Sequence, residues 1–202
     1  QPIEDVFDYH YYTNEEYLTV LIRKPDGEEW ELEIEKEFEE DLGIEFESSL
    51  MDEYRSCRNK CIFCFIDQMR PGLRKSLYVK DDDWRLSLMM GNFVTLTNVD
   101  DQELDRIIRR HASPLFISVH ATDGQVRKRM MRNPNAENIL PRLKRLKENG
   151  IRFHCQIVCC PGWNDGEVLR QTLDDLAALA PAAQTVAVVP VGLTAYRDGL
   201  EP

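Results

Sequence analysis

The segment Cys57-Arg58-Asn59-Lys60-Cys61-Ile62-Phe63-Cys64 places three of the chain's six cysteines within eight consecutive residues. Their spacing is C-x3-C-x2-C, with an aromatic residue directly before the third cysteine. Three thiolates this close together can hold three corners of one [4Fe–4S] cube and leave its fourth iron without a protein ligand. An open iron is a position where chemistry can occur, whereas a fully ligated cube mainly transfers electrons.

Other thiol sites explain this spacing less well. A ferredoxin run has four cysteines, and a structural zinc site needs four ligands, usually as two pairs. The second pair would have to come from a distant histidine or from Cys155, Cys159 or Cys160, about ninety residues later. A disulfide is not favoured either, because three close cysteines form an odd set. The expected cluster ligands are Cys57, Cys61 and Cys64.

The segment also resembles the signature of the radical S-adenosylmethionine (radical SAM) superfamily, C-x3-C-x-aromatic-C. The likeness extends from Cys57 to Asn98 and to the stretches ISVHATDGQVRKRMMRN (117–133), QIVCCPGWNDG (156–166) and VAVVPVGLTAYR (186–197). These stretches are similar to a bacterial subgroup that has an N-terminal PDZ-like segment and a C-terminal domain of unknown function. The resemblance is specific for cofactor chemistry and almost silent on substrate.

The resemblance implies two cofactors, a [4Fe–4S] cluster and S-adenosylmethionine, and an electron donor of the ferredoxin or flavodoxin type. It implies that Phe63 packs near the adenosyl group and that Pro190 and Gly192 line the adenine. Gly91 and Asn92 take the place of a Gly-Gly-Glu stretch that binds the amino group of S-adenosylmethionine. The chain departs from the family there, because no glutamate follows Gly91.

Charge is unevenly distributed along the 202 residues, whose net charge is −11. Residues 1–56 carry 19 acidic and 4 basic side chains, whereas residues 57–202 carry 17 acidic and 21 basic ones. The acidic balance therefore belongs to the first part, and a nucleic-acid substrate for the second part stays open. The apolar runs are too short to span a membrane, and the cytoplasm is the expected location.

The first part of the chain predicts a β-hairpin. Residues 17–23 have the composition of a strand, residues 24–27 (KPDG) are a turn signal, and residues 29–35 alternate apolar side chains with glutamates. The glutamates are expected to form the solvated face of the hairpin. The resemblance implies that residues 1–42 are part of a PDZ-like module with an acidic linker, and that residues 43–202 are the radical SAM core.

From residue 43 the pattern changes to repeated strand–helix units, which favours an α/β fold with a parallel sheet covered by helices. Helices are expected to begin at Asp100 or Asp101, at Asn138, and at Asn164 or Asp165. Strands are expected at residues 44–46, 85–90, 114–120, 151–159 and 185–191. The resemblance implies a partial (β/α)6 barrel, so about five of its six units are expected here, with the sixth after residue 202.

Two polar residues lie at the end of the third expected strand. Ser118 and His120 alternate with Val119, so their side chains should point the same way. Ligands bind at the carboxyl ends of the strands in such sheets, which makes both residues candidates for catalysis and Ser118 also for cofactor binding. The alternative for His120 is a satisfied, partly buried side chain.

Two charged runs have competing interpretations. The basic residues Arg127, Lys128, Arg129 and Arg132 either hold a carboxylate or phosphate or form a solvated helix face. The three aspartates at residues 81–83 are expected to be a solvated turn, because they are not spaced as metal ligands.

The expected function is that of a radical SAM enzyme, which cleaves S-adenosylmethionine reductively to a 5′-deoxyadenosyl radical that abstracts hydrogen from an unknown substrate. One alternative is a non-enzymatic iron–sulfur electron carrier or regulator. Another is a radical SAM methyltransferase acting on nucleic acid, suggested by the SVHA stretch and the basic run. That reaction needs Cys155 or Cys159 to face the cavity, whereas a cysteine buried on a strand is ordinarily a small hydrophobe, as Cys160 also can be.

Overall fold

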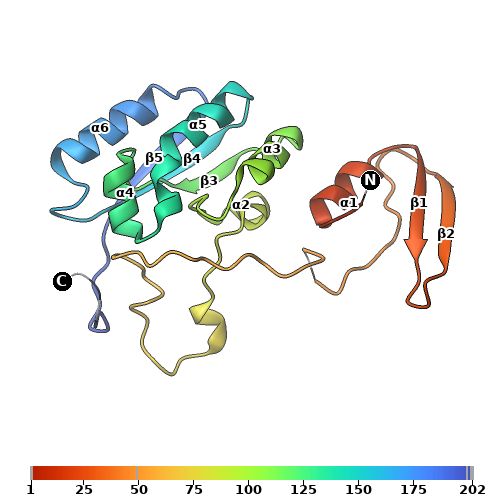
Figure 1. Ribbon diagram of the computed structural model, residues 1–202, viewed down its shortest axis with the longest axis horizontal. Coiled ribbons are helices and arrows are strands. Elements are labelled where there is room, and N and C mark those ends of the chain that lie inside the picture. The colour runs from red at the N-terminus through yellow and green to blue at the C-terminus, as the bar shows by residue number, and fades with distance from the viewer. Residues whose placement is uncertain (1, 49, 199, 201–202) are drawn as a thin grey trace. The chain divides into compact units, whose positions relative to one another are not determined.

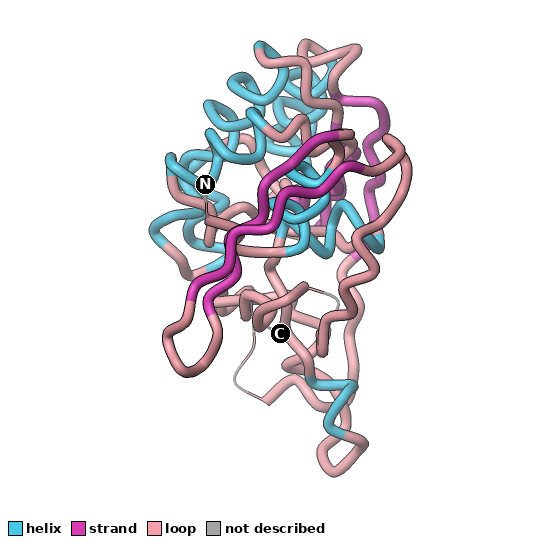
Figure 2. The backbone as a smooth tube through the Cα atoms, turned by 90° about the vertical axis from the view of Figure 1, so that its right-hand side faces the viewer, coloured by secondary structure: helices cyan, strands magenta, loops and turns pink. Residues whose placement is uncertain are grey.

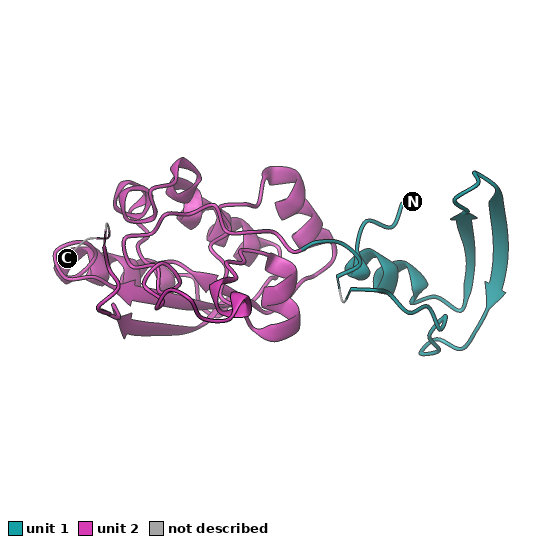
Figure 3. Cartoon of the chain, turned by 90° about the horizontal axis from the view of Figure 1, so that it is seen from below, with its two compact units in different colours: residues 1–53 teal, residues 54–202 magenta. Residues whose placement is uncertain are grey.

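The structure is a computed structural model that describes residues 2–48, 50–198 and 200 of the chain (Figure 1). Figure 2 distinguishes the helices, strands and loops of the chain by colour. Most of the helices and strands lie within residues 84–190, whereas residues 36–83 are mostly loop. The chain divides into two compact units, residues 1–53 and 54–202 (Figure 3). Within the described residues, none of the helices has the length and apolar character to cross a lipid bilayer.

The first unit contains a short helix and the predicted hairpin. Helix α1 (Val6–Thr13) begins after Asp5, whose carboxylate accepts hydrogen bonds from two backbone N–H groups of the first turn. Strands β1 (Tyr17–Arg23) and β2 (Glu29–Glu35) pair antiparallel, and Gly27 takes a φ of +89° in the turn between them. The hairpin is confirmed as an element, α1 is an addition, and the PDZ-like identity of residues 1–42 stays a prediction.

A parallel sheet is the centre of the second unit. Its named strands are β3 (Leu115–Ser118), β4 (Phe153–Cys159) and β5 (Ala183–Pro190), in the order β3-β4-β5. Val94 pairs in parallel with Ile117 as an isolated bridge on the other side of β3. The predicted α/β class with a parallel sheet is confirmed, whereas the completeness of a barrel stays a prediction.

Three helices of the second unit match predicted ones, and each precedes a strand. The longer helices are α3 (Asp101–Arg109), α4 (Gly124–Met131), α5 (Ile139–Glu148) and α6 (Gly166–Ala177). Of these, α3 lies before β3, α5 before β4 and α6 before β5. The predicted starts at Asp100 and Asp165 are confirmed as N-caps. The shorter ones are η1 (Lys75–Tyr78), α2 (Trp84–Met90) and η2 (Pro134–Asn138).

Two of the predicted strands are wrong. Residues 85–90 lie in α2, because the Asp83 carboxylate caps this helix at the N–H of Arg85 and Gly91, with a φ of +75°, ends it. A short apolar run has no periodicity that separates a strand from a buried helix. Residues 44–46 form neither a strand nor a helix. The segment that pairs with β3 lies instead around Val94, beyond α2.

The core of the second unit lies along one face of this sheet. Ile117 of β3 and its register partner Cys155 of β4 are at most 1% exposed, as is Ile157 two residues further along β4. Ser118 pairs with Gln156, and successive strand residues face opposite sides of a sheet. Ser118 therefore lies on the face opposite to the Ile117–Cys155 pair.

Candidate functional site

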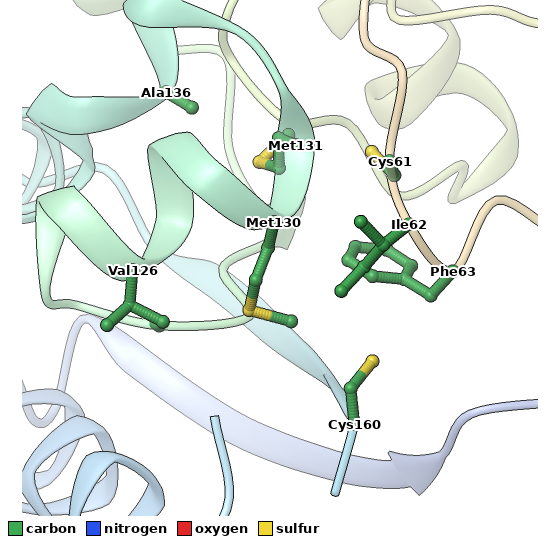
Figure 4. Close-up of a cluster of buried hydrophobic side chains, with 9 residues drawn as sticks. Cys61, Ile62, Phe63, Val126, Met130, Met131, Ala136 and Cys160 are labelled. Carbon is green, nitrogen blue, oxygen red and sulfur yellow. The ribbon is translucent and has the colours of Figure 1, made fainter. Parts of the chain in front are cut away.

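The three-cysteine loop lies beside the carboxyl ends of β3 and β4. The ring centroid of Phe63 is 4.5 Å from that of His120, which follows β3 by two residues. Ile62 and Phe63 share a buried cluster with Cys160, the residue after β4 (Figure 4). The N–H of Ile62 also donates to the carbonyl of Met130 in α4, at 2.9 Å. The fold thus brings the loop to the edge at which parallel α/β sheets bind ligands.

The thiols of this loop are chemically suited to an iron–sulfur cluster. All six cysteines of the chain are free, with Cys61 buried and Cys57 and Cys64 half-buried. Burial raises the pKa of each of the three thiols, and the charges of Cys57 and Cys64 raise the pKa of Cys61 further. Three neighbouring thiolates therefore need a strong positive charge, which metal ions provide.

The three thiols fit such a cluster in chemistry and number, but their side chains are not yet arranged around a common metal position. Within the residues described, no three His, Cys, Asp or Glu side chains are already gathered closely enough to hold a metal ion. The loop lacks helix and strand structure from Cys57 to Cys64, so its thiols are not constrained by a regular backbone ladder. Cys57, Cys61 and Cys64 would hold three irons.

Asn59 makes four hydrogen bonds, one within the loop, two to the segment after Val94 and one to the residue that caps η2. Its Nδ2 donates to the Sγ of Cys57 at 3.3 Å and to the Oγ1 of Thr95 at 3.0 Å. Its Oδ1 accepts from the Oγ1 of Thr97 at 3.0 Å and from the Nδ2 of Asn133 at 2.7 Å. The amide thus satisfies its hydrogen-bonding capacity largely within the protein while it holds a cysteine sulfur.

Asp82 is the acceptor at the centre of the same network. Its carboxylate accepts from the N–H and the Oγ1 of Thr95, both at 2.6 Å, and shares the single hydroxyl hydrogen of Thr97, at 3.1 Å, with Asn59. The side chain is only 2% exposed, and burial raises its pKa. The predicted solvated turn at residues 81–83 is wrong here, because three directed donors compensate the loss of water. Asp83 is buried as well and pairs with Arg85 at 2.7 Å.

Arg127 is buried rather than solvated. Its guanidinium donates to four backbone carbonyls at 2.7 to 2.9 Å, those of Thr95, Ser118, Val119 and Ala136. Burial lowers its pKa to about 9. Both interpretations of the basic run are therefore wrong for Arg127. Its side chain instead joins the carboxyl end of β3 to the segment after Val94 and to η2.

The rest of the basic run lies nearer the surface. Lys128 pairs with Glu137 at 3.1 Å, and the Arg129 guanidinium lies 6.0 Å from the centre of the Trp163 ring. The sequence analysis did not identify Asn59, Asp82 or Arg127 as site residues. Apart from Cys57, which is two residues from Asn59, the partners of their side chains are 8 to 74 residues away, so no local spacing signals them.

Ser118 and His120 both lie at the end of β3, as predicted, but they do not continue one strand. His120 has a φ of +64°, a left-handed conformation that ends the alternation of side chains. Its Nδ1 accepts a hydrogen bond from the N–H of Val158 at 3.2 Å, which assigns the proton of a neutral ring to Nε2. Burial lowers the pKa of His120 to about 3. Ser118 is buried, and its carbonyl is one of the four that Arg127 holds.

Gly91 and Asn92 do not follow a strand, in contrast to the prediction. They come directly after α2 and before Val94, whereas Thr95 comes directly after Val94. Gly91 and Asn92 therefore lie at the amino end of the short segment that pairs with β3, and Thr95 lies at its carboxyl end. The Asn92 side chain donates to Asp81 at 3.0 Å. The error follows from the misassigned strand at residues 85–90. The residues after the carboxyl end of the segment that pairs with β3 are instead Thr95 and Thr97.

Pro190 ends β5, and Gly192 follows it in a loop. Their neighbours line a small cavity of about 140 Å³ beside the cysteine loop. Its lining residues are Ile62, Cys160, Pro161, Trp163, Val191, Leu193 and Arg197. This places the stretch predicted to line the adenine next to Ile62 and hence next to the cysteine loop, while the predicted contacts themselves stay untested.

The three later cysteines differ in their surroundings. Cys155 is buried on the face of β4 opposite to that of Gln156 and Ser118, as expected of a small hydrophobe. Burial raises its pKa to about 12. Cys160, in contrast, packs against the cysteine loop in the buried cluster. Cys159 is half-buried at the end of β4, and the methyltransferase alternative, which needs Cys155 or Cys159 to face the cavity, stays a prediction.

The parallel sheet and the thiol loop at its carboxyl edge define an α/β protein with a candidate cofactor site. A family model described as a radical SAM-like domain matches residues 36–186. The chain belongs to this family. A comparison with curated proteins finds no match.

Proposed function

We propose that this protein is a radical SAM enzyme whose cluster is held by Cys57, Cys61 and Cys64. Family membership supports the class of enzyme. The observation that carries the assignment of the site is the contact between Phe63 and His120, because it sets the three-thiol loop against the end of β3. When bound, a [4Fe–4S] cluster supplies one electron to S-adenosylmethionine, which breaks to methionine and a 5′-deoxyadenosyl radical.

The chain's own residues position the cofactors and exclude water. Asn59 orients the Sγ of Cys57, and Asp82 with the two threonines fixes Asn59. The proposed contacts to S-adenosylmethionine come from Phe63, Ser118, Pro190 and Gly192, and the same role for Gly91 and Asn92 stays a prediction. His120 and Ser118 are the proposed catalytic residues. A neutral His120 can donate only from Nε2, so it would bind a substrate or cofactor acceptor rather than act as a cation.

The test is anaerobic reconstitution with iron and sulfide, followed by reduction and electron paramagnetic resonance with and without S-adenosylmethionine. A [4Fe–4S]⁺ signal that changes on addition of S-adenosylmethionine supports the proposal. Cys61→Ala should lose the signal, whereas the matched variant Cys159→Ala on β4 should keep it. Release of 5′-deoxyadenosine would then show cleavage.

The same experiment distinguishes an electron carrier from a radical SAM enzyme. A carrier needs no open iron, so its cube signal should not respond to S-adenosylmethionine. A signal that does not respond would support an electron carrier or regulator and contradict the enzyme. Failure to assemble a cube would contradict both functions.

A further inference from the structure

A polar cleft of about 770 Å³ lies in the second unit, beside the cysteine loop. This volume is within the range of about 300–1,000 Å³ that small-molecule sites have. Its wall consists of Arg58 from the loop, residues 97–101 at the start of α3, residues from the end of α4 through η2, and the first half of α5. None of the described residues that we propose to hold the cluster or S-adenosylmethionine lines it.

The cleft is lined by positively charged groups from three separate segments. The guanidinium groups belong to Arg58, Arg132, Arg142 and Arg145. The acidic residues of the lining are Asp100 and Asp101, so the lining carries a formal charge of +2, and Asp105 behind it pairs with Arg145. The Asp100 carboxylate is already occupied, because it caps α3 by accepting from the N–H of Glu103 at 2.8 Å.

Contacts from the wall hold two of these arginines in place. Arg142 donates to the carbonyl of Leu96, and Arg145 pairs with Asp105 and lies 3.8 Å from Asp101. A guanidinium has five N–H donors, so these bonds orient the groups and leave donors for a ligand. Partial burial lowers the pKa of Arg142, and the nearby Asp101 and Asp100 carboxylates offset only part of this shift.

Asn98 gives the cleft an acceptor. Its Nδ2 donates to the carbonyls of Ser56 at 3.0 Å and Asp82 at 3.4 Å, which fixes the orientation of the amide. Its Oδ1 is buried and has no hydrogen-bond partner in the described part of the chain. A buried acceptor of this kind is ordinarily paired, so a ligand bound here should bring an N–H or O–H to it.

We infer that this cleft binds a phosphate monoester that carries a hydroxyl or amine group. Such a phosphate has a charge of about −1.5 to −2 at neutral pH, which matches the formal charge of the lining. Its oxygens suit bidentate contacts with guanidinium groups, and the hydroxyl or amine would donate to Asn98. The phosphate can come from a free sugar phosphate or from the 5′ end of an RNA.

The test is calorimetric titration of the full chain without its cofactors, so its outcome does not depend on the proposed function. Glycerol 3-phosphate and a 5′-phosphorylated RNA oligonucleotide are the two phosphate probes, and malonate is the carboxylate probe. Arg58→Gln changes an exposed residue of the cleft and should weaken phosphate binding about tenfold. The matched variant Arg170→Gln, on the exposed side of α6, should leave it unchanged.

Tighter binding of glycerol 3-phosphate than of the RNA would assign a small phosphate, and the reverse order would assign an RNA end. Both support the inference if Arg58→Gln weakens the binding. Inorganic phosphate should bind more weakly than glycerol 3-phosphate, since it brings no carbon-bound hydroxyl. No binding of either phosphate probe, stronger binding of malonate, or equal losses in the two arginine variants would overturn the inference.

Discussion

At the residue scale, Asn59 contacts a proposed cluster ligand without being a ligand itself. Its Nδ2 donates to the Sγ of Cys57 at 3.3 Å. A hydrogen bond to a ligating sulfur stabilises the reduced, more negative state of an iron–sulfur cluster. The amide is fixed by Thr95, Thr97 and Asn133, so the donor stays aimed at the sulfur.

Asn59→Ala should therefore lower the reduction potential of the reconstituted cluster. A hydrogen bond worth about 0.5–1.5 kcal/mol corresponds to roughly 20–60 mV for a one-electron couple. A redox titration followed by electron paramagnetic resonance measures this shift. Asn149→Ala, at the exposed end of α5, is the control and should leave the potential unchanged. Equal potentials in wild type and Asn59→Ala would remove the proposed role.

His120 makes folding stability depend on pH in a definite direction. Its pKa is lowered by burial to about 3, below the value of about 6.5 for an exposed histidine. The unfolded chain therefore binds the extra proton first, so the contribution is fully present above about pH 6.5 and is lost as the pH falls towards 3. The loss has an upper limit of about 1.4 kcal/mol per pH unit.

The measurement is urea unfolding of the cofactor-free protein between pH 7 and 5. Wild type should lose more stability over this interval than His120→Gln, which cannot take up the proton. The exposed His10 in α1 supplies the control, and His10→Gln should follow wild type. Parallel pH profiles for wild type and His120→Gln would contradict the assignment of a buried neutral ring.

At the scale of elements, Arg127 of α4 joins three segments by donating to four carbonyls. Arg127→Met keeps most of the apolar stem and removes the guanidinium donor from all four carbonyls, of which that of Val119 still accepts from the N–H of Ala121. We expect a loss of at least about 3 kcal/mol in the free energy of unfolding, since each unsatisfied buried acceptor costs about 1–3 kcal/mol. Urea unfolding checks this, and the exposed Arg129→Met on the same helix should cost less than about 1 kcal/mol. Similar losses in the two variants would contradict it.

For the whole molecule, the division into residues 1–53 and 54–202 predicts where a protease cuts first. Residues 41–48 contain neither helix nor strand, and both Glu47 and Glu53 are exposed. A protease that cleaves after glutamate should therefore release a stable fragment that begins near residue 48 or 54. Mass spectrometry of the fragments identifies the site. Initial cleavage within residues 84–190 would show that the second unit is not the more stable part.

The elements differ in how far the sequence could predict them. α3 was predictable because Asp100 precedes a run with apolar residues at helical spacing, and β5 was predictable because most of it is a continuous apolar run. α2 was not, because RLSLMM is too short for its periodicity to separate a strand from a helix. Its capping residue, Asp83, is one of the three aspartates that the sequence predicts to form a solvated turn.

The sequence by itself determined the cysteine spacing, the alternation of strands and helices, and the family resemblance, because each is a local pattern of residue types. Only the tertiary structure decided the polar network of Asn59, Asp82 and Arg127 and the position of Gly91 before rather than after a strand segment. The physical reason is that buried polar groups must find partners wherever the fold supplies them. Thr95 and Asn133 meet Asn59 from 36 and 74 residues away, and no local pattern encodes such a contact.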